Sequence, residues 1–406
     1  MMDERPTLFR LEPPIRKYDW GSHEFLARIR GAAFPTVDPE AELWIGAHDA
    51  DPAVVPNEGP LNQLIAAEPD RFLGSLAKKK FGPHLPFLLK VLAIAKPLSL
   101  QVHPTLEQAR AGFIEENDAG IAISSSDRTF VDDNHKPELV VAVSDFDALM
   151  GFREVQEIIS FVKLLINCGA VRLSTRVLDP LQSSPDVAGL SAVLKSLLGQ
   201  PDDADFVAET VQAASQIALS GGEYATSAGW FVKIAGFYPA HPDVIATLLL
   251  KLVHLTPGEA MYIAAGQVHS YLGGLVIEIM SSSDNVVRGG LTSKRVDVPA
   301  FLGMIDWAPG AIARLAGVIN GAVTIWTPPI DDFILTRISL GTASQDDQSV
   351  EVTAPMVLFA ISQEATVSRG VEEVQLKQGE SMFVAPGSPI SISGDATLWG
   401  GSCRVG

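Results

Sequence analysis

The sequence predicts a mainly β protein with a helical insertion, because the spacing of its apolar residues changes twice along the chain. Residues 1–152 contain short apolar runs, such as Leu85–Val91 and Leu139–Val143, bounded by proline, glycine and polar turn residues. Between about residues 153 and 252 the apolar positions change to helical spacing. Strand-like runs then return after Leu255 and continue to the end of the sequence.

Two amphipathic patterns support the helical insertion. They consist of Val155, Ile158, Ile159, Val162, Leu165 and Ile166, and of Val207, Val211, Ala214 and Ala218. Residues three and four apart lie on one face of a helix, so each pattern predicts a helix with one buried face. Polar and glycine-containing segments at 200–203 and 220–222 are expected to separate the helices.

An internal repeat supports a second barrel. The segment 258–269 (GEAMYIAAGQVH) resembles the segment 379–390 (GESMFVAPGSPI), 121 residues later and without a gap. Each copy is typical of a turn, strand, turn and strand, the unit that β-barrels and jelly rolls repeat. The second copy has Ile390 where the first has His269, so we expect a structural barrel without metal. Gly273-Gly274 is predicted to form a hairpin turn.

Composition limits the classes of function. The 406 residues allow two or three domains, and 47% hydrophobic residues can build large cores. A formal net charge of −18 lacks the basic footprint of a nucleic-acid-binding protein and disfavours binding to an anionic membrane. The only cysteines, Cys168 and Cys403, predict neither a disulfide framework nor a thiolate metal site. With no apolar signal segment or membrane-length run, we expect a cytoplasmic protein without membrane partners.

Polar side chains share one face of a predicted strand at residues 99–104 (SLQVHP). Because alternate residues of a strand point the same way, Ser99, Gln101 and His103 would face a polar pocket. Leu100 and Val102 would point into a core. Such a row of polar groups suits the interior of a barrel that binds a ligand.

Glu138 and His269 complete a candidate metal site. Glu138 begins an apolar strand, where an unpaired carboxylate is costly to bury and a cation would remove the cost. Two imidazoles, a carboxylate and an amide oxygen suit zinc with an open position for water or substrate. Ordinary structural roles remain open at this point: hydrogen bonding for Gln101, core packing for the histidines, and pairing of Glu138 with Lys136.

The chain resembles the type I mannose-6-phosphate isomerase family, also called phosphomannose isomerase, from Tyr18 to about Trp307. The resemblance rests on separated motifs in the family's order: 18–22 (YDWGS), 42–48 (ELWIGAH), 99–104 (SLQVHP), 133–138 (DNHKPE) and 283–294 (SDNVVRGGLTSK). Gly289 and Asp19 depart from alanines that are commoner in the family. Neither change removes a ligand or a charge.

The resemblance implies a site and a fold. One zinc ion per chain would be held by Gln101, His103, Glu138 and His269. The implied catalytic residues are Arg288, Lys136, His135 and Asp284, and the implied substrate-binding residues are Ser99, Lys90 and Lys294. The family fold implies a catalytic cupin-type jelly roll (residues 1–152 with 253–315), a helical insertion domain (153–252) and a second cupin-like barrel (316–406).

The implied activity is the interconversion of mannose 6-phosphate and fructose 6-phosphate by a monomer, feeding mannose and GDP-mannose metabolism. The reaction moves a proton between C1 and C2 through a cis-enediol. Zinc and the guanidinium of Arg288 suit the developing oxyanion. Lys136 is the favoured base, with His135 as an alternative base or ring-opening acid, and Lys90 and Lys294 would bind the phosphate.

Two other functions are compatible with a cupin-like site. A metal-dependent oxygenase would combine histidines with a carboxylate around iron, but Gln101 and the nearby lysines and arginine argue against it. A non-enzymatic sugar-binding barrel would have no need of a group that transfers protons.

Overall fold

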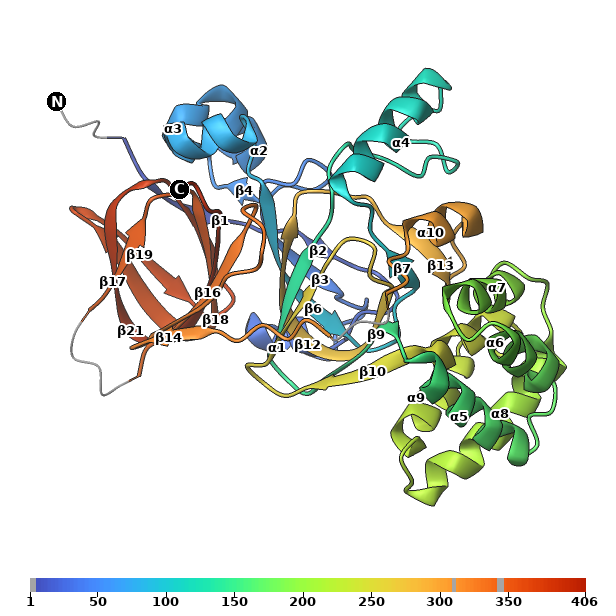
Figure 1. Ribbon diagram of the computed structural model, residues 1–406. Coiled ribbons are helices and arrows are strands. Elements are labelled where there is room, and N and C mark those ends of the chain that lie inside the picture. Colours follow the sequence, from blue (N-terminus) through green and yellow to red (C-terminus); the bar gives the residue numbers. More distant parts are fainter. Residues whose placement is uncertain (1–4, 309–311, 342–346) are drawn as a thin grey trace.

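Two large curled antiparallel sheets, a small two-stranded sheet and a cluster of helices make up the described part of the molecule (Figure 1). The computed structural model describes residues 5–308, 312–341 and 347–406. In Figure 1 the C-terminal strands, orange to red, form a barrel at the left, and the green helices of residues 155–249 lie at the lower right. The expected mainly β fold with a helical region is confirmed.

A ten-stranded sheet forms the centre of the molecule, with the main order β10-β9-β12-β6-β3-β2. Its strands are β2 (Ile15–Arg16), β3 (Glu42–Gly46), β6 (Phe87–Ile94), β7 (Leu100–Val102), β8 (Glu138–Ala142), β9 (Phe146–Phe152), β10 (Leu250–Leu255), β11 (Ala260–Ile263), β12 (His269–Ser281) and β13 (Val287–Gly290). β7 pairs with β12 and β13, and β8 pairs with β11 and β12. β12 is therefore the strand that connects the segments carrying the predicted metal ligands.

The predicted hairpin turn at Gly273-Gly274 is wrong, because β12 continues through both residues. The register shifts between Tyr271 and Gly273, where β12 stops pairing with β9 and begins to pair with β6. Gly274 has a φ of +123°, and a Cβ there would lie 2.5 Å from the carbonyl oxygen of Asp145. The two glycines therefore form a bulge that bends the strand, rather than a chain reversal.

Replacing Gly274 with alanine is expected to lower the free energy of unfolding by about 1–3 kcal/mol from backbone strain, with the overlap at Asp145 adding to it. Gly273→Ala is the matched control, because its Cβ would meet its nearest atom at an ordinary 3.7 Å. Urea unfolding of both variants measures the difference. Equal stability of the two variants would contradict this account of the bulge.

A nine-stranded sheet contains the C-terminal strands, with the main order β1-β20-β18-β21-β16-β15-β14. Its strands are β1 (Leu8–Leu11), β14 (Val318–Asn320), β15 (Val323–Trp326), β16 (Ile334–Ser339), β17 (Gln348–Val352), β18 (Met356–Arg369), β19 (Glu372–Lys377), β20 (Ser381–Val384) and β21 (Gly387–Ser402). β1 pairs with β20 over residues 8–11. The predicted first domain (residues 1–152 with 253–315) includes this strand, although its pairing partner lies in the nine-stranded sheet, and the domain boundaries stay predictions.

Both copies of the repeat adopt the predicted turn and strands. Gly258 and Gly379 have φ values of +91° and +84° and precede β11 and β20, respectively. The next strand begins at His269 in the first copy, and includes Ile390 in the second. Ile390 is buried in an apolar cluster of the nine-stranded sheet. The C-terminal copy thus places an apolar core residue where the first copy has a polar one.

Helices cover the edge of the ten-stranded sheet and confirm both predicted helical patterns, which lie in α5 (Val155–Asn167) and α8 (Ala204–Ser220). With them lie η1 (Ser174–Leu178), α6 (Asp179–Ser183), α7 (Val187–Leu197), α9 (Ala225–Ala235) and η2 (Pro242–Leu249). Their apolar core continues into β7 and β9 through Val102 and Phe152. The helices therefore support the strand that carries Gln101.

Shorter elements complete the fold: α1 (Phe25–Ile29), β4 (Val54–Val55), β5 (Gly59–Pro60), α2 (Leu61–Ala67), α3 (Pro69–Phe81), α4 (Leu106–Asp118) and α10 (Val298–Met304). Among the described residues, every helix is too short or too polar to cross a membrane.

The two faces of β6 have different partners. Phe87 and Leu89 belong to one apolar core together with Trp326 and Trp399 of the nine-stranded sheet. The rings of those two tryptophans stack at 5.6 Å. Because side chains alternate along a strand, Lys90 points to the other face, where it lines a cavity.

Candidate metal centre and active-site cavity

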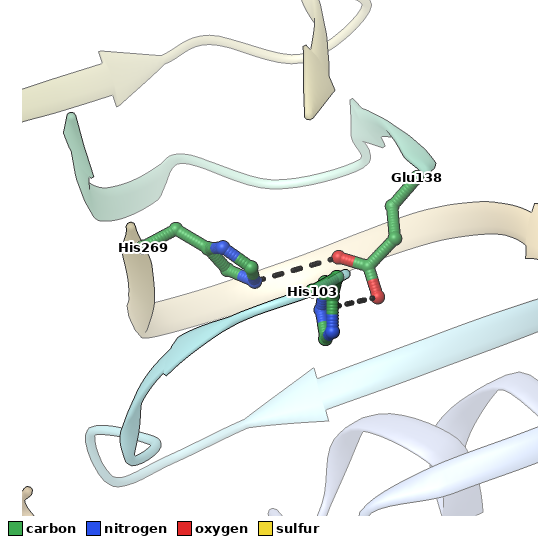
Figure 2. A group of neighbouring side chains, drawn as sticks. All are labelled: His103, Glu138 and His269. Atoms are coloured by element: carbon green, nitrogen blue, oxygen red, sulfur yellow. Dashed lines mark ion pairs between the residues drawn. The ribbon is translucent and has the colours of Figure 1, made fainter. Parts of the chain in front are cut away.

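Two histidines and a glutamate converge from three segments of the ten-stranded sheet (Figure 2). His103 follows β7, whereas Glu138 and His269 are the first residues of β8 and β12. His103 Nε2 lies 3.3 Å from Glu138 Oε1, and His269 Nε2 lies 3.5 Å from Glu138 Oε2. All three side chains are buried, and their candidate ligand atoms lie within 4.8 Å of one another.

The hydrogen bonds of the two histidines leave Nε2 free for a metal. Each Nδ1 lies 2.9 Å from a backbone carbonyl oxygen, that of Asn285 for His103 and that of Gln267 for His269. A carbonyl only accepts, so Nδ1 carries the proton and Nε2 presents a lone pair. Within the described residues both buried Nε2 atoms lack a hydrogen-bond partner. Such orphaned acceptors beside a carboxylate fit a bound divalent cation.

The charges of the three groups also fit a cation. Burial lowers the pKa of both histidines, and burial together with His103 brings that of His269 to about 4. Burial alone would raise the pKa of Glu138, but His103 and Lys136 outweigh it and hold the pKa well below its usual range. At neutral pH the group therefore offers two neutral imidazoles and one carboxylate.

Gln101 lies beside this group. In the sheet it is directly opposite His269 on β12 and Arg288 on β13. Directly opposed residues of antiparallel strands have their side chains on the same face. The side chain of Gln101 therefore lies on the same face as His269, and its role as the fourth metal ligand stays a prediction.

A cavity of about 650 Å³ opens in front of the metal centre. Most of the predicted site residues line it: Lys90, Ser99, Gln101, Lys136, Glu138, Asp284, Arg288 and Lys294. His103 and His269 lie behind Glu138, almost completely buried. The sequence therefore identified a set of residues that the fold brings into one place from strands far apart along the chain.

Arg288 and Lys294 lie together on the cavity wall and form a positive patch. Burial lowers the pKa of Arg288, and burial followed by the charge of Arg288 lowers that of Lys294. The Lys294 ammonium lies 5.7 Å from the ring of Tyr18. No ion pair within the described part of the chain neutralises either cation. Two neighbouring cations without a carboxylate partner favour the binding of an anion.

Lys90 has a different environment. Its Nζ lies 3.5 Å from Glu42 Oε2 and 3.6 Å from Glu278 Oε2, beside the ring of Trp44. Burial opposes the charge of Lys90, but the two carboxylates outweigh it and raise the pKa. Because its charge is already compensated twice, Lys90 is less suited to hold a phosphate than Lys294, contrary to the expectation from the sequence.

Glu278 is a cavity residue that the sequence analysis missed. It accepts a hydrogen bond of 3.0 Å from the hydroxyl of Tyr271, which also lies 3.3 Å from Glu138 Oε2. Burial and then the charge of Glu138 raise the pKa of Glu278 to about 7. Simple alternation from His269 puts residue 278 on the opposite face. The bulge after Tyr271 reverses the alternation and turns Glu278 inward.

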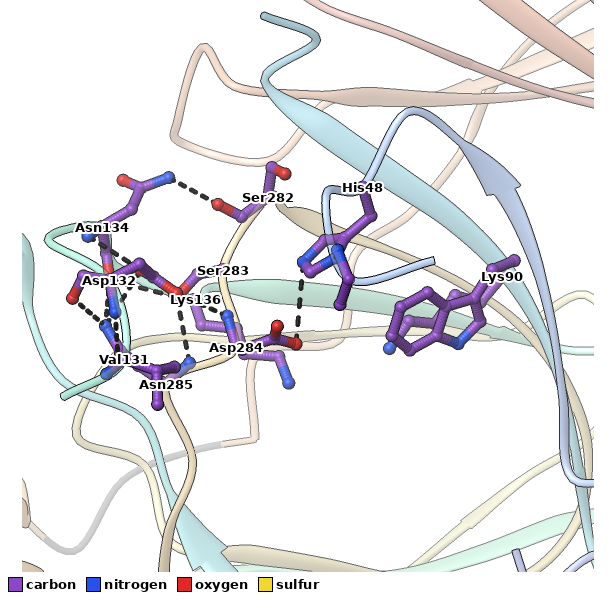
Figure 3. A network of polar contacts seen from close by, with 12 residues as sticks. His48, Lys90, Val131, Asp132, Asn134, Lys136, Ser282, Ser283, Asp284 and Asn285 are labelled. Carbon is purple, nitrogen blue, oxygen red and sulfur yellow. Dashed lines mark hydrogen bonds and ion pairs between the residues drawn. The ribbon is translucent and has the colours of Figure 1, made fainter. Parts of the chain in front are cut away.

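Two loops beside the cavity are fastened together by a polar network (Figure 3). The side chain of Asn285 donates to the carbonyl oxygens of Asp132 and Asn134 at 2.8 and 2.9 Å. The carboxylate of Asp132 accepts from the backbone N–H of Asp284 at 2.7 Å. Asp284 lies 3.7 Å from His48 Nε2. The network holds the loop that carries Lys136 against the loop that carries Asp284.

Unlike the other predicted site residues, all of which lie in the described ranges, His135 points away from both the cavity and the metal centre. Its Nε2 lies 2.9 Å from Asp332 Oδ1, a residue of the loop between β15 and β16. The ring does not line the cavity. Lys136, the next residue, lines it and has its Nζ 3.7 Å from Glu138 Oε1. The geometry therefore favours Lys136 over His135 as the group that meets a substrate.

Known proteins match both the sequence and the fold. The family model described as "Phosphomannose isomerase type I, catalytic domain" matches residues 8–155. Mannose-6-phosphate isomerase of Escherichia coli K12 is 35% identical over 391 residues, which cover 95% of this chain and 96% of that protein. The human mannose-6-phosphate isomerase is 28% identical over 420 residues, with 95% of each protein covered.

Solved structures agree over nearly the whole chain. A mannose 6-phosphate isomerase bound with zinc and yttrium has a TM-score of 0.87 and 32% identity, and covers 98% of this chain and 100% of its own. The Salmonella typhimurium mannose 6-phosphate isomerase bound to fructose 6-phosphate and zinc has a TM-score of 0.86 with the same identity and coverage.

Proposed function

The chain belongs to the type I phosphomannose isomerase family, and from this premise we propose how its cavity interconverts mannose 6-phosphate and fructose 6-phosphate. The observation that carries the proposal is that a buried metal centre, the amine of Lys136 and the cations Arg288 and Lys294 meet in one cavity. The reaction is an aldose–ketose isomerisation, in which one proton moves between C1 and C2 of the sugar through a cis-enediol.

Zinc is the cofactor, held by His103, Glu138 and His269 with Gln101 as the fourth ligand. When bound there, it supplies a Lewis acid that polarises a sugar oxygen and stabilises negative charge. The two orphaned Nε2 atoms and the Glu138 carboxylate support this assignment, because catalytic zinc sites are built from such nitrogen and oxygen ligands and leave one position open for water or substrate.

Arg288 is assigned to the oxygen that gains charge as the enediol forms. It stands opposite Gln101 in the sheet and faces the cavity without a carboxylate partner in the described residues. Its planar guanidinium can donate two parallel hydrogen bonds to sugar oxygens. It therefore orients the substrate and stabilises the oxyanion at once.

Lys136 is assigned the transfer of the proton between C1 and C2. Its amine reaches the cavity close to Glu138, whereas the ring of His135 is engaged by Asp332. Glu278 lines the cavity and its pKa is raised to about 7, so its carboxyl can give a proton to the ring oxygen of the sugar or take one from a sugar hydroxyl as the ring opens.

The phosphate is assigned to Lys294, with the hydroxyl of Ser99 as a further donor, because both line the cavity. Lys90 instead keeps the carboxylates of Glu42 and Glu278 in place. Asp284 would accept hydrogen bonds from sugar hydroxyls. In this proposal the enzyme acts as a cytoplasmic monomer and feeds mannose and GDP-mannose metabolism. Among the described residues of the cavity, no contact favours a cupin oxygenase or a non-enzymatic sugar-binding barrel instead.

A coupled assay tests the proposal. The zinc-loaded protein is expected to form fructose 6-phosphate from mannose 6-phosphate, and in deuterated water the enediol route places solvent deuterium on C1 or C2. An inactive zinc-loaded protein would overturn the assigned reaction. Turnover with no deuterium on carbon would argue for a direct hydride shift instead.

A further inference from the structure

Asp332, which lies between two strands of the nine-stranded sheet, contacts the loop that carries Lys136. Asp332 lies between β15 and β16, in the region of the C-terminal barrel. Its Oδ1 lies 2.9 Å from His135 Nε2 and accepts a hydrogen bond of 2.9 Å from the hydroxyl of Ser281, the last residue of β12. One carboxylate therefore connects the second sheet, the loop before β8 and the end of β12.

We propose that Asp332 is a positioning residue for Lys136: it holds the His135 ring outside the cavity, so that the next residue directs its amine inside. The inference rests on the proposed function, because it assumes that Lys136 transfers the proton. It also gives the C-terminal barrel a task in catalysis, although that barrel has an apolar interior where the first barrel has His269.

The direction of the two neighbouring side chains supports this role. His135 contacts Asp332, whereas Lys136 lines the cavity 3.7 Å from Glu138 Oε1. In an extended segment, consecutive side chains point to opposite sides. Fixing the ring of His135 therefore also fixes the side to which Lys136 points.

The loop is fastened at a second point, and the two anchors complement each other. Asn285 holds residues 131–134 through its amide, which accepts from Val131 N–H at 2.9 Å and donates to the carbonyl oxygens of Asp132 and Asn134. That network ends one residue before His135. In the segment between Asn134 and the start of β8, the backbone carbonyl of Pro137 accepts from Ser281 N–H at 3.2 Å, and Asp332 is the contact that holds the ring of His135.

The burial of the pair distinguishes it from an ordinary surface contact. The side chains of His135 and Asp332 are only 19% and 18% exposed. The neighbouring Asp331 is 46% exposed and pairs with Lys80 and Arg404 instead. Asp331 thus also joins the second sheet to the rest of the molecule, without touching the loop of Lys136, and provides a matched control.

Steady-state kinetics of zinc-loaded variants test the inference. Asp332→Ala is expected to lower kcat by about 10- to 100-fold, the usual effect of losing an orienting partner, with KM changed less than about twofold. Asp332→Asn keeps an oxygen that can accept from the His135 ring and should recover most of the kcat. Asp331→Asn should leave kcat unchanged. Zinc content and the unfolding midpoint are measured for each variant.

A double-mutant cycle with His135→Ala separates positioning from chemistry. If Asp332 acts through His135, each single variant and the double variant lose a similar factor in kcat, so the effects are not additive. A much larger loss for His135→Ala than for Asp332→Ala would make His135 the catalyst and overturn the inference. Should Asp332→Ala fail to fold, His135→Ala and Asp332→Asn still give the comparison.

The outcomes also separate this inference from the proposed function. An inactive wild-type protein with full zinc content would overturn the proposed function itself. An active wild type with an unchanged kcat for Asp332→Ala, or with equal losses for Asp331→Asn and Asp332→Ala, would overturn the positioning role alone.

Discussion

Glu138→Gln is expected to abolish zinc binding and isomerisation together. Glu138 supplies the one negative charge between two neutral imidazoles, and both Nε2 atoms lie within 3.5 Å of its carboxylate oxygens. Changes to residues that only orient ligands weaken metal affinity by about 10- to 100-fold, so loss of the charged ligand should cost at least about 100-fold. Zinc content after gel filtration and kcat for mannose 6-phosphate measure the two effects.

Glu278→Gln is the matched control for this change. Glu278 is also a buried carboxylate in this cavity and also contacts the Tyr271 hydroxyl, but it does not belong to the group of metal ligands. The variant should retain one zinc per chain. A Glu138→Gln protein that keeps its zinc and its kcat would remove Glu138 from the metal centre.

Arg288→Ala is expected to lower kcat by about 100- to 1000-fold, because removal of one oxyanion donor has this effect in enzymes that stabilise a similar charge. Zinc content should be normal, since the guanidinium is not a ligand. The fold should also survive, because Arg288 makes no ion pair within the described residues. Stopped-time assays give kcat, and metal analysis of the same preparation gives the zinc content.

Lys294→Ala is the comparison that separates charge stabilisation from substrate binding. Lys294 lies in the same positive patch but is assigned to the phosphate. Its loss should raise KM more than it lowers kcat. If Arg288→Ala raised KM with an unchanged kcat, Arg288 would belong to phosphate binding and would have no part in the oxyanion.

The elements with strong local patterns were predictable from the sequence. The apolar runs of β6 and β8 and the periodic helices α5 and α8 were found at nearly their observed positions. The two copies of the repeat also folded as expected. In each case, burial of a periodic apolar face decides the local structure, and that period is visible in a single sequence.

Long-range pairing and irregular backbone were not predictable in the same way. β1 pairs with β20, and residues 8–11 contain no local signal for partners 370 to 376 positions away. The glycines at 273 and 274 have the composition of a turn, yet they form a bulge inside β12. That bulge is why Glu278 was overlooked, because it reverses the faces of the strand.

The metal ligands needed both the residue pattern and the resemblance. Alternation placed Gln101 and His103 on one face, but only the pairing of β7 with β12 brings His269 opposite Gln101. The roles of Lys90 and His135 depend on their neighbours Glu42, Glu278 and Asp332, which lie on other strands and loops. Residue type alone could not reveal that Lys90 is paired with two carboxylates, or that the ring of His135 faces away from the cavity.

Removal and return of the metal is the most direct test of a zinc-dependent isomerase. The protein is stripped with a strong chelator, and fructose 6-phosphate formation from mannose 6-phosphate is measured as zinc is titrated back. Activity should fall to background and recover fully at one zinc per chain. Full activity in a demonstrably metal-free sample would contradict the account.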